Sequence, residues 1–154
     1  MVKLLLISHS YRRNPSSCSL PAIERYDGLF FRIARKYLGN TKDVNVLVMK
    51  DDLTLIDANT LLPYTPPEGE NWKTKSISKE SIEKARKKNE IFLKKKLKQR
   101  RYSEIYLAMG KRYAEALPDL SPYSLEVKFP IHGGIGPKAQ ALKEWFLGTS
   151  NNEG

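Results

Sequence analysis

The sequence predicts an α/β domain in which a mostly parallel sheet of about four strands lies between two layers of helices. Short, nearly continuous apolar runs, such as Val44 to Met49, are typical of parallel strands buried on both faces. These runs alternate with segments in which apolar residues recur every three to four positions, as in amphipathic helices. The 154 residues suit one domain with its own core. We expect this domain over 1–148 and a disordered tail over 149–154.

Strands and helices can be placed in chain order from these patterns. The helix after the first strand is expected to begin at an N-cap, Asp27, and to end at Gly39. The most basic helix is expected over 78–101, capped by Ser78. Further helices are expected over 111–117 and from Gly136-Pro137 to Gly148. The four strands are expected at 3–8, 44–49, 104–109 and 124–130.

The segment 50–77 contains three prolines and several polar residues. We therefore expect a long irregular connection here and no further element. Loops of this length in compact domains are usually functional or mobile.

Cysteine usage and hydropathy limit the class of protein. The single cysteine, Cys18, cannot form an intramolecular disulfide, and no Cys and His residues have zinc-ligand spacing. We expect an unreactive structural thiol, no metal and no cofactor. The first apolar run stops at Ser8 and is followed by Arg12 and Arg13, which favours a buried strand over a signal peptide. No stretch approaches the roughly 18 to 20 apolar residues that cross a bilayer, so a cytoplasmic protein is expected.

Positive charge is concentrated in one predicted helix. Residues 78–101 contain 11 basic and 3 acidic residues, a net charge of +8, whereas the whole chain carries +10. Such a local field favours binding of a polyanion, most simply nucleic acid, and the alternative is a solvated helix face. A membrane surface fits less well, because the helix lacks an exposed face rich in Trp or Phe. The predicted nucleic-acid-binding residues are Lys87, Lys88, Lys94, Lys95, Lys98 and Arg101.

Polar residues follow the first predicted strand, where ligands bind in open α/β sheets. His9 can titrate near neutral pH, and the arginines at 12 and 13 suit bidentate binding of phosphate or carboxylate. A polar surface turn is the alternative. After the second strand, Asp51 and Asp52, with the later Asp57, could orient a substrate or magnesium, but their spacing matches no metal motif.

A glycine-rich loop precedes the last predicted helix. Backbone N–H groups at Gly133, Gly134 and Gly136, together with Lys138, could bind an anion such as phosphate. The alternative is a tight turn that needs glycine for its own geometry. The loop matches neither the dinucleotide-binding fingerprint nor the P-loop. His132 beside it is either a ligand contact or a hydrogen-bonded residue at a strand end.

Several motifs together resemble an uncharacterised family of small α/β proteins from archaea, bacteria and phages. They are LLISHSYRR at 5–13, IERYDGLFF at 23–31, LID at 55–57 followed by Pro63-Tyr64, Gly110-x-x-Tyr113, and GGIG at 133–136. The signature of that family is an opening strand ending in S-C-S-K-x-K. Its members are distantly similar to the core domain of archaeosine synthase, which acts on a deazaguanine base in transfer RNA.

This resemblance implies functional residues and also a changed chemistry. His9 stands where the family has cysteine, and Tyr11 stands where it has lysine. The resemblance is therefore as consistent with binding that lacks the family's chemistry as it is with catalysis. The positions that match the family pattern are Ser8, Ser10, Arg13, Tyr26, Asp27, Gly110, Tyr113, Gly134 and Gly136. From these positions and from the loop after the first strand, we predict that the catalytic residues are His9, Arg13 and Asp27. The predicted ligand-binding residues are Ser8, Ser10, Arg12, Tyr26, Gly133, Gly134, Gly136 and Lys138.

Two functions follow from these observations. The first is a base-modifying or glycosidic-bond enzyme that takes a nucleotide into a pocket at the strand ends, and a phosphate-containing small ligand would fit the same pocket. A flipped base would need stacking and edge contacts. The second is a non-catalytic nucleic-acid-binding module that uses the helix at 78–101. The residues that could contact the base are Tyr11, Tyr26, Tyr64, Trp72, Arg12 and Arg13.

Overall fold

The computed structural model describes residues 2–67, 77–130 and 133–151, and it has the predicted α/β fold. Four strands are parallel: β1 (Val2–Ser8), β3 (Val44–Met49), β6 (Tyr102–Ala108) and β7 (Glu126–Lys128). A fifth, β4 (Leu55–Asp57), pairs antiparallel with β3. The order across the sheet is β4-β3-β1-β6-β7, which makes the sheet mixed but mostly parallel.

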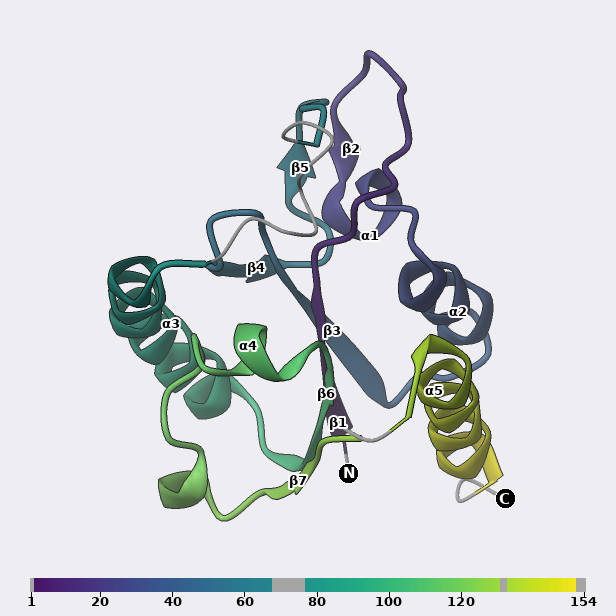
Figure 1. Cartoon of the computed structure of the whole chain (residues 1–154). Helices are drawn as coiled ribbons and strands as arrows, with labels where there is room; N and C mark the ends of the chain where they lie inside the picture. The colour runs from purple at the N-terminus through teal and green to yellow at the C-terminus, as the bar shows by residue number, and fades with distance from the viewer. Residues whose placement is uncertain (1, 68–76, 131–132, 152–154) are drawn as a thin grey trace.

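Helices cover both faces of this sheet, as Figure 1 shows. Helix α2 (Leu29–Leu38) and helix α5 (Ile135–Asn151) lie on one face. Helix α3 (Lys79–Gln99) and the short α4 (Lys111–Ala114) lie on the other. Side chains alternate along β1, so Leu5 and Ile7 join the core under α2 and α5, whereas Leu4 and Leu6 join the core under α3. This two-sided burial explains the continuous apolar run.

The expectation of an irregular connection over 50–77 is wrong, because this segment contributes two strands. One is β4, and the other is β5 (Leu61–Leu62), which pairs antiparallel with β2 (Leu20–Pro21). Together with α1 (Ala22–Arg25), β2 and β5 form a small lobe beyond the carboxyl end of β1 (Figure 1). Strands of two or three residues are too short to show a hydrophobic period, and tertiary pairing alone places them.

Several predicted element ends differ from the structure. Gly28, not Asp27, is the N-cap of α2, since the helix begins at Leu29, and the Asp27 carboxylate instead pairs with Arg32 and Arg35. Helix α4 ends at Ala114, and β7 covers only three residues. Helix α5 begins at Ile135 and continues past Gly148 to Asn151, because one glycine weakens a helix interior by only about 1 kcal/mol. Residues 149–151 of the predicted tail are therefore helical, and 152–154 lie outside the described residues.

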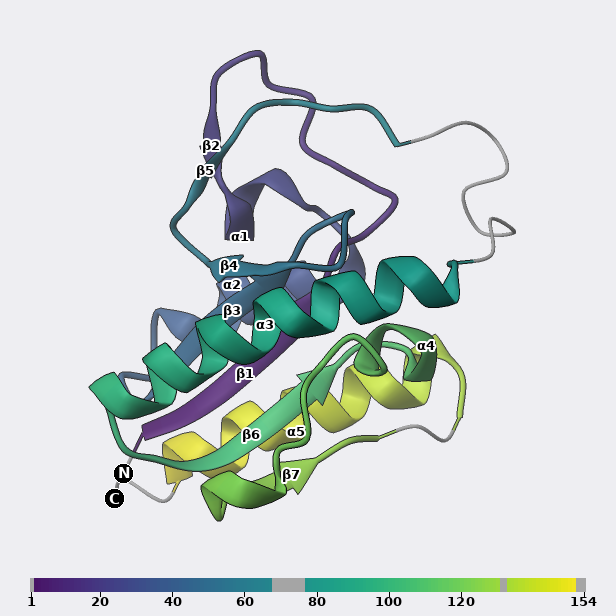
Figure 2. The same ribbon diagram turned by 90° about the vertical axis from the view of Figure 1, so that its left-hand side faces the viewer.

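Helix α3 agrees closely with its prediction. The Ser78 hydroxyl accepts a hydrogen bond from the Ser81 N–H at 3.0 Å, which confirms Ser78 as the N-cap. Figure 2 shows the helix along its full length on the outside of the sheet. None of the helices within the described ranges combines the length and apolarity needed to cross a lipid bilayer.

Candidate functional site

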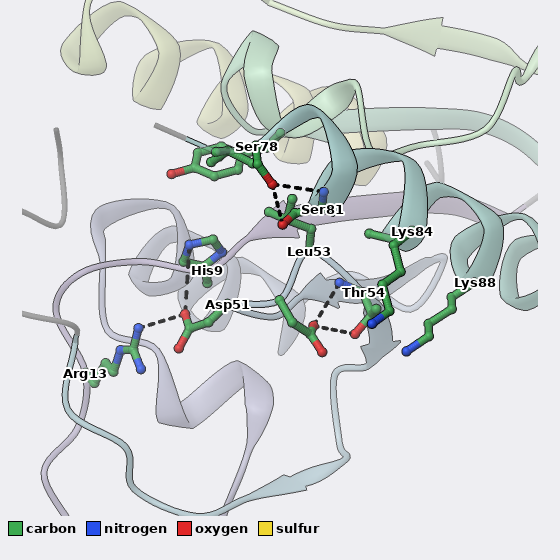
Figure 3. Close-up of a pocket in the computed structure, with 13 residues that line it drawn as sticks. His9, Arg13, Asp51, Leu53, Thr54, Ser78, Ser81, Lys84 and Lys88 are labelled. Carbon is green, nitrogen blue, oxygen red and sulfur yellow. Dashed lines mark hydrogen bonds and ion pairs between the residues drawn. The ribbon is translucent and has the colours of Figure 1, made fainter. Parts of the chain in front are cut away.

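A pocket of about 570 Å³ lies beyond the carboxyl ends of β1 and β3, and we call it the strand-end pocket (Figure 3). One side comes from the loop after β1 and from residues 51–54 after β3. The other side comes from the first turns of α3, with Tyr113 of α4 and Ile77 also lining it. Its volume lies within the range of about 300–1,000 Å³ that is typical of small-molecule sites.

Arg13 and Asp51 form the charged pair of this pocket. Arg13 Nη2 donates to Asp51 Oδ1 at 2.7 Å, and its Nη1 donates to the Thr65 carbonyl at 3.0 Å. The Arg13 side chain is 2% exposed, whereas that of Asp51 is 44% exposed. Arg13 is therefore held in place behind the carboxylate, while Asp51 faces the open pocket. The Tyr26 ring, with its centroid 5.3 Å from the guanidinium carbon, packs against Arg13 from within the core.

His9 is the second buried polar side chain at this site. Its Nε2 lies 3.8 Å from Asp51 Oδ1, and the Tyr113 ring packs edge-on with centroids 5.1 Å apart. Burial lowers the pKa of His9 below 6.5, and the Arg13 charge lowers it further, although Asp51 opposes both effects. His9 is therefore neutral at pH 7. A neutral imidazole beside a carboxylate can accept a proton from a bound molecule.

This lowered pKa predicts a pH-dependent stability. The unfolded chain binds a proton at His9 more readily than the folded chain, so the free energy of unfolding should fall as the pH drops below about 6.5. Urea unfolding between about pH 8 and 5 should show this loss, and a His9→Asn variant should show less of it. Asp27, Asp52 and Asp119 do not interfere, because their pKa values lie below 3.8. An identical pH profile in both proteins would contradict the assignment.

Helix α3 supplies the cations on the opposite side. Lys84 and Lys88 extend from the helix toward the loop that carries Asp51 and Thr54 (Figure 3). Within the described ranges neither lysine forms an ion pair, whereas Lys50 pairs with Asp52 and Lys96 pairs with Asp57. The pocket therefore presents two ammonium groups, of which that of Lys88 also interacts electrostatically with Asp52.

The loop at 50–54 is held in place by hydrogen bonds from both sides. Asp52 accepts from the Thr54 N–H at 3.0 Å, within a turn in which Leu53 has a φ of 71°. From α3, the buried amide of Asn89 accepts from the Leu55 N–H at 2.8 Å and donates to the carbonyls of Leu53 and Ala116, both at 2.9 Å. Asn89 fixes the distance between α3 and the acidic loop. In the sequence, Asn89 could be recognised as a polar residue within the apolar stripe of a helix.

Of the residues predicted to be catalytic or to bind a ligand or nucleic acid, His9, Arg13 and Lys88 line the strand-end pocket, and so do the candidate acids Asp51 and Asp52. Ser10 instead supports the neighbouring turn, because its hydroxyl accepts from the Gly28 N–H at 3.1 Å. Asp27 lies outside the pocket lining, and Arg32 and Arg35 hold its carboxylate. Ser8 is half-buried at the end of β1, and Arg12 is exposed. Ser78, Ser81, Lys84 and Tyr113 also line this pocket, although none of them was predicted as a catalytic or binding residue.

The glycine loop is not part of the strand-end pocket lining. Gly133 needs to be glycine, because its φ is +87° and an added Cβ would lie 3.0 Å from Pro137. An added Cβ at Gly134 or Gly136 would meet no atom within 4 Å. The Lys138 N–H donates to the Gly134 carbonyl at 3.2 Å, so this amide is used by the helix itself. Anion binding at the loop stays a prediction, and His132 and Trp72 lie outside the described residues.

The predicted nucleic-acid-binding residues Lys87, Lys88, Lys94, Lys95, Lys98 and Arg101 are all exposed. Lys96 differs from them, because it is half-buried and its Nζ lies 2.6 Å from Asp57 Oδ1. Comparison of the chain with protein-family models, with curated proteins and with solved structures finds no match. The family resemblance of the sequence therefore stays a prediction.

Proposed function

We propose that this protein binds nucleic acid and takes one phosphate-bearing nucleotide into the strand-end pocket. The observation that carries the proposal is that Lys84 and Lys88 belong both to the pocket and to the most basic helix. Asp51 is already paired with Arg13 and Asp52 with Lys50, so the two lysines of α3 supply charge that a phosphate can use. A ligand held by them would lie at the start of a helix with a net charge of +8 over 78–101.

The remaining pocket surface suits the nucleoside part of such a ligand. Leu53, Ile77 and Ala85 provide apolar surface, and Tyr113 adds an aromatic ring. His9 and Asp51 provide hydrogen-bonding groups on the side opposite the lysines. A few polar groups among apolar ones are the usual composition of a specific small-molecule site.

The proposal predicts that nucleoside monophosphates bind more tightly than the matching nucleosides. Amide NMR titration should move residues 51–54 and 78–88 first. Because both lysines are exposed, each contact with phosphate should contribute about 0.5–1 kcal/mol, so Lys84→Ala combined with Lys88→Ala should weaken nucleotide binding about tenfold. The double variant Lys87→Ala, Lys94→Ala is the matched control, because it removes the same charge outside the pocket lining. Equal affinity for nucleosides and nucleotides would contradict the proposal.

A second candidate function, acid–base catalysis on the bound nucleotide, is favoured by the buried neutral His9 beside Asp51. Either group could accept the proton of a water molecule that attacks the glycosidic carbon, while the departing base takes up a proton. Release of a free base in the same nucleotide samples would reveal this activity. A non-catalytic binding module would leave the nucleotide intact.

A further inference from the structure

Eight of the twelve charged residues of α3 lie in two rows on its surface. Lys84, Lys88, Ile91, Lys95 and Lys98 follow one another at spacings of four, three, four and three residues, so they lie on one face of the helix. All five are exposed, and Ile91 is 73% exposed. This pocket-side row carries four positive charges and no acidic residue.

The neighbouring row has a different character. Glu83, Lys87, Glu90 and Lys94 follow one another at the same spacings, and their charges alternate. A glutamate four residues before a lysine forms a favourable pair across one helical turn. This mixed row has no net charge, and it is the ordinary solvated face of a helix. Of these two rows, only the pocket-side row carries excess positive charge that could face a polyanion.

The pocket-side row leads directly into the strand-end pocket. Its first two members, Lys84 and Lys88, line the pocket, and its last member lies 14 residues from the first. At 1.5 Å per residue the row extends about 21 Å along the helix. The helix lies on the outside of the sheet (Figure 2), and all five side chains of this row are exposed.

We propose that a single-stranded nucleic acid follows the pocket-side row, with one unpaired nucleotide in the strand-end pocket and neighbouring phosphates on Lys95 and Lys98. This inference rests on the proposed function and narrows its substrate class. A base within a duplex would have to be unpaired and unstacked before it could enter, and that cost is least for a strand that is already single. Grooves that bind single strands combine a line of cations with contacts to the base faces, and the apolar Ile91 lies between the lysines.

The test compares two variants that each lose four positive charges. One replaces Lys84, Lys88, Lys95 and Lys98 with alanine, and the other replaces Lys79, Lys87, Lys94 and Arg101, which are also exposed. Binding of a fluorescent oligothymidine at low salt is measured by anisotropy, with thermal unfolding as the folding control. If each lost contact weakens binding about threefold, the loss of four contacts should make the pocket-side variant bind roughly 100-fold more weakly. The second variant should lose only the few-fold effect of its lower net charge.

Three results would overturn part or all of this account. Equal losses in the two variants would refute the pocket-side path while leaving nucleic-acid binding itself supported. Tighter binding of a duplex of the same length would refute the single-strand assignment. No binding of the wild-type protein to either nucleic acid at low salt would contradict the proposed function.

Discussion

Replacing Arg25 with methionine should lower the free energy of unfolding by about 4 kcal/mol. Arg25 is only 2% exposed, and its guanidinium donates to the carbonyls of Asn14, Ser16, Cys18 and Leu62. Methionine fills much of the same volume but donates no hydrogen bond. Each of these part-buried carbonyls that loses its donor costs about 1 kcal/mol. The same bonds hold together the small lobe formed by β2, β5 and α1, beside the loop that carries Arg13.

Urea unfolding of Arg25→Met measures this effect, and Arg12→Met is the matched control. The Arg12 side chain is 68% exposed, and its only ion pair among the described residues is with Asp27, at 3.6 Å. A surface change of this kind usually alters stability by no more than about 0.5 kcal/mol. If Arg25→Met cost no more than Arg12→Met, the lobe would not depend on the buried guanidinium.

The fold could be predicted from the sequence because its central strands have a distinctive pattern. Val44–Met49 and the run at 3–8 are mostly buried, and such nearly continuous apolar runs are typical of parallel strands in the middle of a sheet. The β4 strand gave no such signal. It has three residues, and it forms because the turn at 50–54 brings Leu55 back beside Met49. Its position depends on tertiary contacts that a local pattern does not contain.

The candidate site was predictable only in part. His9 and Arg13 line a pocket because they follow a central strand, as the rule for ligand sites in open sheets predicts. The glycine loop also follows a strand, but β7 lies at the edge of the sheet, two strands from β1. Local sequence does not specify the order of strands in the sheet, so the two loops could not be separated beforehand. Nor does the local sequence show that the loop after β3 brings Asp51 into contact with Arg13, which lies 38 residues earlier in the chain.

The net positive charge of α3 was evident from its residue counts, and the two rows of charged residues are evident from their spacing. The positions of Glu83 and Glu90 already place both glutamates on the mixed row. The structure adds which row adjoins the pocket, because Ile82, Ala85 and Leu93 are buried and thereby orient the helix. Together, the buried stripe and the pocket lining show which row of charges adjoins the pocket.

The dependence of single-strand affinity on salt tests the central claim most directly. If four phosphates are neutralised by the pocket-side row, the logarithm of the association constant should fall with the logarithm of salt concentration with a slope of about −3. The affinity of the wild-type protein for oligothymidine should then drop about 50-fold between about 50 and 200 mM salt. The account is contradicted if no binding is measured at the lowest salt, or if the affinity hardly changes across this range.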